Sequence, residues 1–207
     1  MTATDPRVIR SRAAILDAAT ALFLRDGFRA TTMDNIAETA GVSKRTVYNN
    51  FADKETLFRD VVMAATGLAE EFATDAAAAL TDPGDLPAVL SALARRLAVA
   101  ATSPRVVRLR RLLIGESRLF PDLAAEYYRL APGRVMSALA TAFESLARRG
   151  CLRVTDPGRA AEQFAFLVLG AALDRAMFDG RDQPPRTDSL ARAADDGVHA
   201  FLAIYGP

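Results

Sequence analysis

Residues 31–54, TTMDNIAETAGVSKRTVYNNFADK, contain two short helical patterns that meet at a glycine. In the first pattern, apolar residues recur at i, i+3, i+4 and i+7 and therefore share one face of a helix. They are Met33, Ile36, Ala37 and Ala40. Gly41 follows, where the left-handed backbone that ends many helices costs least. Ser43 then offers an N-cap to a second helix, whose apolar residues Val47 and Phe51 lie one turn apart. The spacing predicts two helices joined by a tight turn.

The exposed face of the second predicted helix carries residue types that bind DNA. At about 100° per residue, Arg45, Thr46 and Asn49 fall opposite the apolar pair Val47 and Phe51. Arginine can donate two hydrogen bonds to guanine and asparagine can pair with adenine, while hydroxyl and ammonium groups suit phosphate oxygens. The pattern predicts a DNA-binding helix-turn-helix. The alternative is a polar surface helix in an unrelated helical protein, because such patterns also arise by accident.

About fifty residues resemble the N-terminal domain of TetR-family transcriptional regulators. The likeness rests on IL-AA--LF and DGF within residues 15–28 and on TTM--IAE-AGVSK-TVY--F--KE-LF within residues 31–58. It implies a recognition helix over residues 43–51. Carried over by position, it implies phosphate contacts from Thr32, Thr46, Tyr48 and Lys54, and base contacts from Lys44, Arg45 and Asn49. The predicted DNA-binding set also includes Thr31, Ser43 and Asn50.

Composition favours a cytoplasmic protein of one or two domains. The chain has 207 residues, of which 51% are hydrophobic, so it can bury a core. No uncharged run approaches the ~18 residues of a transmembrane helix, and residues 1–12 lack the apolar centre of a secretory signal. The single cysteine, Cys151, excludes an intramolecular disulfide and fits a reducing cytosol.

The charge balance implies that any surface for nucleic acid is local. The net charge is +1, whereas a nonspecific nucleic-acid binder is usually strongly basic. Family members often carry glycine at the place of Arg45, so the operator sequence cannot be borrowed from a relative. Arg7, Arg10 and Arg12 could add contacts from a flexible arm, or they could form a solvated basic tail.

The pattern beyond residue 54 is helical throughout and predicts an all-α fold. We expect an N-terminal three-helix DNA-binding domain over residues 1–53 and a helical effector-binding and dimerisation domain over residues 54–207. Proline, glycine and aspartate mark the joints, and Pro132-Gly133 should kink or divide one helix. The predicted helices are 9–26, 32–39, 43–50, 54–80, 86–102, 104–118, 122–149, 157–179 and 187–205.

The last two predicted helices carry wide apolar stripes. The stripes comprise Phe164, Leu167, Val168, Ala171, Leu190, Ala194, Val198, Phe201 and Leu202. Such stripes more often fill a protein's own core than face a partner. The resemblance favours a dimer interface, since TetR-like regulators pair their last two helices into a four-helix bundle. A two-fold pair can also read a palindromic operator.

The middle of the chain mixes large apolar residues with polar ones, as pockets for small effectors do. Residues 110–135 are loosely similar to the AefR-like group of the family, which fixes no ligand. The candidate effector-binding residues are Met63, Arg108, Leu112, Glu116, Tyr127, Tyr128, Phe143, Phe166, Asp174 and Met177. Each of these side chains is more often core than ligand contact. The resemblance implies a repressor that a small effector of unknown identity releases from double-stranded DNA.

An enzyme and a protein-binding adaptor are the competing classes. His199 has no triad partner nearby in sequence, Cys151 has no second cysteine to share a metal with, and there is no phosphate-binding glycine loop. The sequence therefore predicts no enzyme, no metal site, no cofactor and no membrane partner. A helical adaptor would not need Arg45, Tyr48 and Asn49 exposed together, and it stays the alternative to a DNA-binding regulator.

Overall fold

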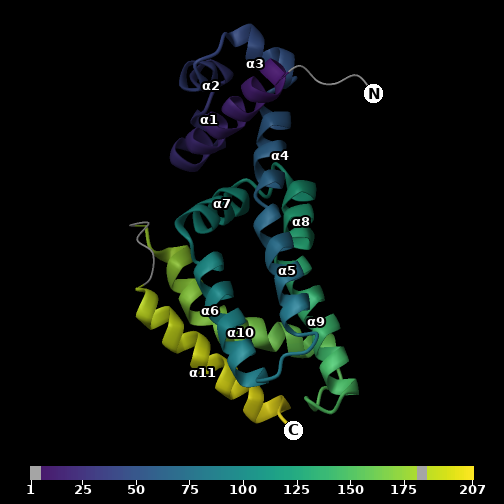
Figure 1. Ribbon diagram of the computed structural model, residues 1–207. Helices are drawn as coiled ribbons and strands as arrows, with labels where there is room; N and C mark the ends of the chain where they lie inside the picture. Colours follow the sequence, from purple (N-terminus) through teal and green to yellow (C-terminus); the bar gives the residue numbers. More distant parts are fainter. Residues whose placement is uncertain (1–5, 181–185) are drawn as a thin grey trace. The chain divides into compact units, whose positions relative to one another are not determined.

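The computed structural model describes residues 6–180 and 186–207, and within these ranges it contains helices and no strand (Figure 1). This confirms the predicted all-α fold. The helices are α1 (Pro6–Ala30), α2 (Met33–Ala40), α3 (Lys44–Asn50), α4 (Lys54–Ala64), α5 (Gly67–Ala79), α6 (Leu86–Ala101), α7 (Pro104–Gly115), α8 (Pro121–Leu130), α9 (Pro132–Arg148), α10 (Pro157–Phe178) and α11 (Thr187–Tyr205).

Two of the predicted helices are divided in the structure. The helix expected over 122–149 breaks before Pro132, as its proline predicted, because proline has no N–H to continue the helical ladder. The helix expected over 54–80 ends at Ala64, and α5 begins at Gly67. No proline lies between Ala64 and Gly67, and the apolar pattern continues across this break, so the sequence predicted one helix there. In α1, Gly27 interrupts the helix with a φ of 83°.

The chain divides into two compact units. The first contains residues up to 65 together with 108–124, and the second contains 66–107 and 125–207. This division differs from the boundary expected at residue 53, because α4 belongs to the first core, where Leu57 and Phe58 are fully buried. Phe120 packs there as well, with its ring centroid 5.3 Å from that of Phe58.

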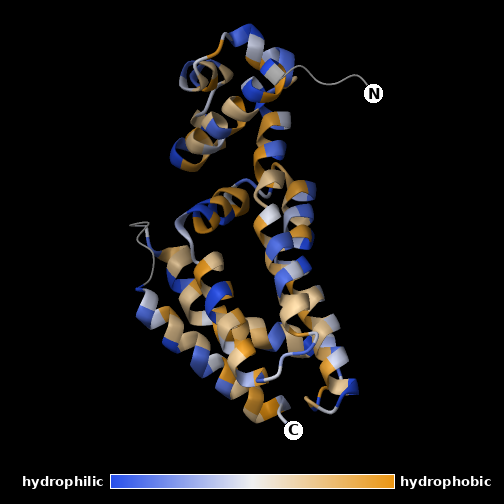
Figure 2. Cartoon of the chain, in the orientation of Figure 1, coloured by the Kyte–Doolittle hydropathy of each residue, from blue (hydrophilic) through white to orange (hydrophobic). Residues whose placement is uncertain are grey.

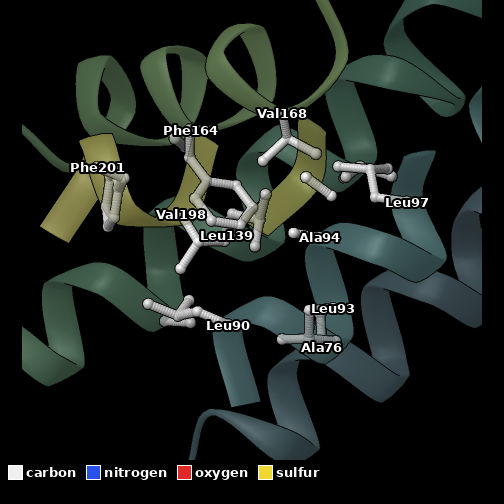
Figure 3. Close-up of a cluster of buried hydrophobic side chains, with 14 of the residues drawn as sticks. Ala76, Leu90, Leu93, Ala94, Leu97, Leu139, Phe164, Val168, Val198 and Phe201 are labelled. Carbon is white, nitrogen blue, oxygen red and sulfur yellow. The ribbon is translucent and has the colours of Figure 1, made fainter. Parts of the chain in front are cut away.

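The core of the second unit lies between α5, α6, α9, α10 and α11. Hydrophobic and hydrophilic residues alternate along these helices, as amphipathic packing requires (Figure 2). Three phenylalanine rings meet at its centre, since Phe143 lies 5.6 Å from Phe164 and 5.0 Å from Phe201 between centroids. Figure 3 shows Phe164, Val168, Val198 and Phe201 among the side chains that fill it.

Most of the residues predicted to face a dimer partner belong to this core instead. They are buried within the chain's own cluster because α10 and α11 pack against α6 and α9. The buried residues of the predicted set are Phe164, Val168, Leu190, Ala194, Val198 and Phe201. Leu202 is half-buried and packs against the same cluster, and only Leu167 and Ala171 of the predicted set are exposed.

Candidate nucleic-acid interface

Helix α2 begins and ends through local contacts that its sequence predicts. The hydroxyl of Thr32 accepts a hydrogen bond from the backbone N–H of Asn35 at 3.2 Å and so caps the first turn. At the other end, Gly41 adopts the left-handed conformation with a φ of 66°. The N–H of Val42 then donates to the carbonyl oxygen of Ala37 at 3.1 Å. The turn between the two helices is therefore fixed at both sides.

Helix α3 is held by its N-cap and by two buried apolar residues. The Ser43 hydroxyl accepts from the N–H of Thr46 at 3.1 Å, and the two hydroxyl groups lie 2.8 Å apart. Val47 and Phe51 are buried, at 0% and 2% exposed, which confirms the side predicted to face the core. The opposite face of α3 therefore points to solvent. Asn50 lies at the edge, and its amide donates to the carbonyl of Thr46 at 2.8 Å.

Three side chains on the outer face of α3 are available to a ligand. Arg45, Tyr48 and Asn49 are exposed, and Tyr48 is 47% exposed despite its aromatic ring. Within the described ranges, no hydrogen bond or ion pair engages the guanidinium of Arg45 or the amide of Asn49. An arginine and an asparagine presented in this way match the donor and acceptor pattern of the DNA major groove.

Lys44 is exposed beside this face, but its ammonium is engaged by a carboxylate of α2. Its Nζ lies 2.8 Å from Oδ1 of Asp34 and 3.0 Å from Oδ2. The hydrogen bond and the charge of Asp34 raise the pKa of Lys44. The pair joins the two helices of the helix-turn-helix across the turn.

Two residues of the predicted DNA-binding set have structural roles. Thr31 is only 1% exposed, and its hydroxyl donates to the carbonyl of Gly27 at 2.8 Å. Lys54 donates from Nζ to the carbonyl oxygens of Phe28 and Thr31, both at 2.9 Å. The same ammonium lies 4.4 Å from the centroid of the Phe28 ring. We therefore leave Thr31 and Lys54 out of the candidate interface, because both serve the end of α1.

Arg12 holds the C-terminal end of α3, a role that the sequence did not indicate. Its guanidinium donates to the carbonyl of Asn50 at 3.0 Å and lies 4.3 Å from the centroid of the Phe51 ring. It also forms an ion pair with Asp60 of α4. Arg12 thus lies within α1 and links three helices, rather than belonging to a flexible arm. Its partners lie 38 or more positions away, so no local pattern could have revealed them.

The segment 116–122 is tied to the helix-turn-helix unit by charge and by aromatic packing. Arg59 of α4 binds Asp122 through both carboxylate oxygens, at 2.7 and 3.2 Å, and this lowers the pKa of Asp122. Arg29 of α1 lies 3.7 Å from Glu116. Glu116, a predicted effector-binding residue, is therefore paired within the first unit.

The other predicted effector-binding residues do not form one site within either unit. Met63, Arg108 and Leu112 lie in the first unit with Glu116, and the remaining six lie in the second. Of those six, Phe143 is fully buried in the core, whereas Phe166, Tyr128 and Asp174 are exposed. A groove of about 640 Å³ runs between α5 and α9, and none of the predicted residues lines it. None of the described helices combines the length and apolar character needed to cross a membrane.

Both parts of the chain match family models. Residues 15–61 match the model of bacterial regulatory proteins of the tetR family. Residues 88–207, more than half of the chain, match the C-terminal domain of AefR-like transcriptional repressors.

The solved structures and curated proteins that resemble this chain are also transcriptional regulators. A protein from Mesorhizobium loti MAFF303099 assigned to the TetR family is 34% identical, with a TM-score of 0.90 over 98% of this chain and 100% of that one. The flavonoid-responsive regulator FrrA is 29% identical, with a TM-score of 0.75 over 96% and 98% of the two chains. The uncharacterised HTH-type transcriptional regulator YhgD of Bacillus subtilis strain 168 is 49% identical over 47 residues, 23% of this chain and 25% of YhgD.

The chain matches about a quarter of the length of the curated relatives, each of which is named as an HTH-type transcriptional regulator. The match to the solved Mesorhizobium loti structure runs over the whole of both proteins. With a capped helix-turn-helix, an outward-facing α3 and a helical second unit, the chain belongs to the TetR family of DNA-binding transcriptional regulators.

Proposed function

We propose that this regulator is a repressor that binds a palindromic operator as a homodimer and is released by a small-molecule effector. The observation that carries it is the outer face of α3. Arg45, Tyr48 and Asn49 are exposed there, while Val47 and Phe51 anchor the opposite side. A short helix with this division fits the major groove, which is wide enough to admit a helix.

The contacts divide by chemistry. Arg45 can donate to O6 and N7 of guanine, and Asn49 can pair with adenine, so these two side chains read sequence. The resemblance implies a base contact for Lys44, but we assign its ammonium to a phosphate oxygen instead, together with the hydroxyls of Tyr48 and Thr32, because phosphate contacts fix register. All five residues are exposed. The hydroxyls of Ser43 and Thr46, by contrast, serve the N-cap, so those residues support the contact surface from within.

A homodimer is supported by exposed apolar residues on the outer side of α10 and α11. Phe166 is 71% exposed, Leu167 40% and Ile204 57%. Large apolar side chains exposed on these two helices are candidates for an interaction surface. Two subunits joined there would carry two recognition helices to two half-sites.

Control by an effector is supported by a relative and by the course of the chain. FrrA is a flavonoid-responsive regulator, so a close fold responds to a small molecule. In this chain, α7 begins in the second unit and ends in the first, and α8 does the reverse. An effector that favours one position of these helices would change operator affinity through its differential binding. A coupling of about 1–3 kcal/mol, a factor of 5 to 150, is enough to regulate a gene.

Selection of bound fragments from a genomic DNA pool tests the DNA-binding part. We expect the native protein to enrich a palindrome and the double variant Arg45→Ala, Tyr48→Ala to enrich none. Arg25→Ala is the matched control, because Arg25 is exposed in the same unit and pairs with its neighbour Asp26. The same weak, unselective binding by the native protein and the double variant would favour the adaptor alternative.

Light scattering tests the dimer. Phe166→Glu should lower the mass in solution to that of one chain, because a buried unpaired carboxylate in the interface is costly. Val99→Glu is the control, since Val99 is also an exposed apolar residue of the second unit, at 51% exposed. A native protein with the mass of one chain would remove the proposed interface.

A further inference from the structure

The ion pair between Asp34 and Lys44 lies at the start of α3, the helix that we propose binds DNA. Both side chains remain largely exposed, at 64% and 59%. Asp34 lies in the first turn of α2, where a carboxylate interacts favourably with the helix dipole. The first turn of α3 carries no acid of its own. Asp34 therefore places a carboxylate of the neighbouring helix beside Lys44, at the start of α3.

A phosphate oxygen and the Asp34 carboxylate are competing acceptors for the same ammonium. Exposed ion pairs of this kind are weak and exchange readily, so Lys44 can be transferred from the carboxylate to a phosphate when DNA binds. The transfer leaves the charge of Asp34 without its partner beside a polyanion. Arg45 and Asn49 lie outside this exchange, because neither side chain forms a hydrogen bond or an ion pair within the described residues.

We infer that Asp34 sets the DNA affinity of this regulator by competing with phosphate for Lys44. The inference rests on the proposed function, and it concerns sequence-independent binding, which depends almost entirely on phosphate contacts. In the native protein, Lys44 contributes less than a full phosphate contact because it must first leave Asp34. Removing the Asp34 charge should release that contact.

The test uses the full chain and a labelled duplex of random sequence, titrated by fluorescence anisotropy between about 50 and 200 mM salt. Asp34→Asn keeps the size of the side chain and one acceptor oxygen, and it removes the charge. We expect the variant to bind several-fold more tightly at low salt. The plot of log affinity against log salt should become steeper by up to about 0.9, the value for one additional phosphate contact.

Two controls separate this competition from a general charge effect. Asp17→Asn removes the same charge from an exposed site on α1 where no ion pair is described, and it should leave the salt slope unchanged. The Asp34→Asn change should also have little effect in a Lys44→Gln background. A gain of equal size in that background, or in Asp17→Asn, would show that Asp34 acts through its charge alone.

Two further outcomes would overturn the inference. Weaker binding by Asp34→Asn would mean that Asp34 holds Lys44 in place for DNA, which overturns the inference. Circular dichroism melts check that each variant is folded. If Asp34→Asn unfolds, Asp34→Ser replaces it, because the serine hydroxyl is also a polar group suited to the first turn of α2. If the folded native protein binds neither this duplex at any salt concentration nor any fragment of the genomic pool, the proposed function itself fails, and the inference fails with it.

Discussion

Gly197 lies inside α11 where this helix packs against α10, and replacing it tests how closely the two helices approach. The residue is buried. A Cβ at this position would lie 2.7 Å from the carbonyl oxygen of Leu167 and 3.0 Å from the backbone nitrogen of Val168. Both are backbone atoms of α10, so no side-chain rotation relieves the overlap. The two helices must separate to admit Gly197→Ala.

Two opposing effects decide the magnitude. Alanine stabilises a helix interior by about 0.5–1 kcal/mol relative to glycine, because it loses less conformational freedom on folding. Extra volume in a well-packed interior costs about 1–3 kcal/mol. Because the overlap at Gly197 is with backbone, the packing cost should approach the upper part of its range. We expect Gly197→Ala to lower the free energy of unfolding by about 1–2 kcal/mol.

Urea unfolding followed by circular dichroism, at one protein concentration, measures this difference. Gly170→Ala is the matched control, because Gly170 also lies within a helix, α10, and a Cβ there meets no heavy atom within 4 Å in the chain. The control should gain up to about 1 kcal/mol, so the two variants should change stability in opposite directions. Equal gains for Gly197→Ala and Gly170→Ala would refute the close approach of α10 and α11.

Three further predictions concern the first unit. Lys54→Ala should lower the melting temperature and leave the salt slope of DNA binding unchanged, because its ammonium bonds to the carbonyl of Phe28; a flatter slope with normal melting would restore a phosphate role. Arg12→Ala should cost about 1–3 kcal/mol in urea unfolding and weaken DNA binding on all sequences, whereas unaltered binding would mean that it does not position α3. Because Arg59 lowers the pKa of Asp122, this pair should stabilise the fold above the unfolded pKa of about 3.9 and lose that effect as pH falls through the folded value. The melting temperatures of native protein and Asp122→Asn should therefore converge as pH falls, and a constant gap would contradict the pairing.

The helix-turn-helix could be predicted because its determinants are local. The hydroxyls of Thr32 and Ser43 accept hydrogen bonds from N–H groups three residues away. Gly41 ends α2 in the left-handed conformation, and the N–H of Val42 then bonds to the carbonyl of Ala37, five residues earlier. The apolar residues Val47 and Phe51 mark the inner side of α3 through helical geometry alone. Each of these signals lies within a few positions of its effect, so the outward face of α3 followed from the sequence.

The predicted site residues that have internal partners in the structure could not be recognised from local sequence. Lys54 has the position of a phosphate contact in the family, yet its ammonium binds carbonyls 23 and 26 residues earlier. In α10, Phe164 to Leu169 form a continuous apolar run, so apolar residues occur on every side of the helix. Such a run cannot indicate which side faces the protein's own core. The structure resolves this by burying Phe164 and exposing Phe166.

In α3 the residues that face solvent differ from those that hold the helix in place, and this affects how regulators of this kind can acquire new targets. Arg45, Tyr48 and Asn49 contribute little to packing, while the cap at Ser43 and the link from Arg12 hold the helix from its two ends. Substitutions at exposed positions usually change stability by less than about 0.5 kcal/mol. Under the proposed function, mutation can therefore explore new operator sequences at Arg45 and Asn49 while the fold tolerates each intermediate, which makes α3 a starting point for retargeting the protein.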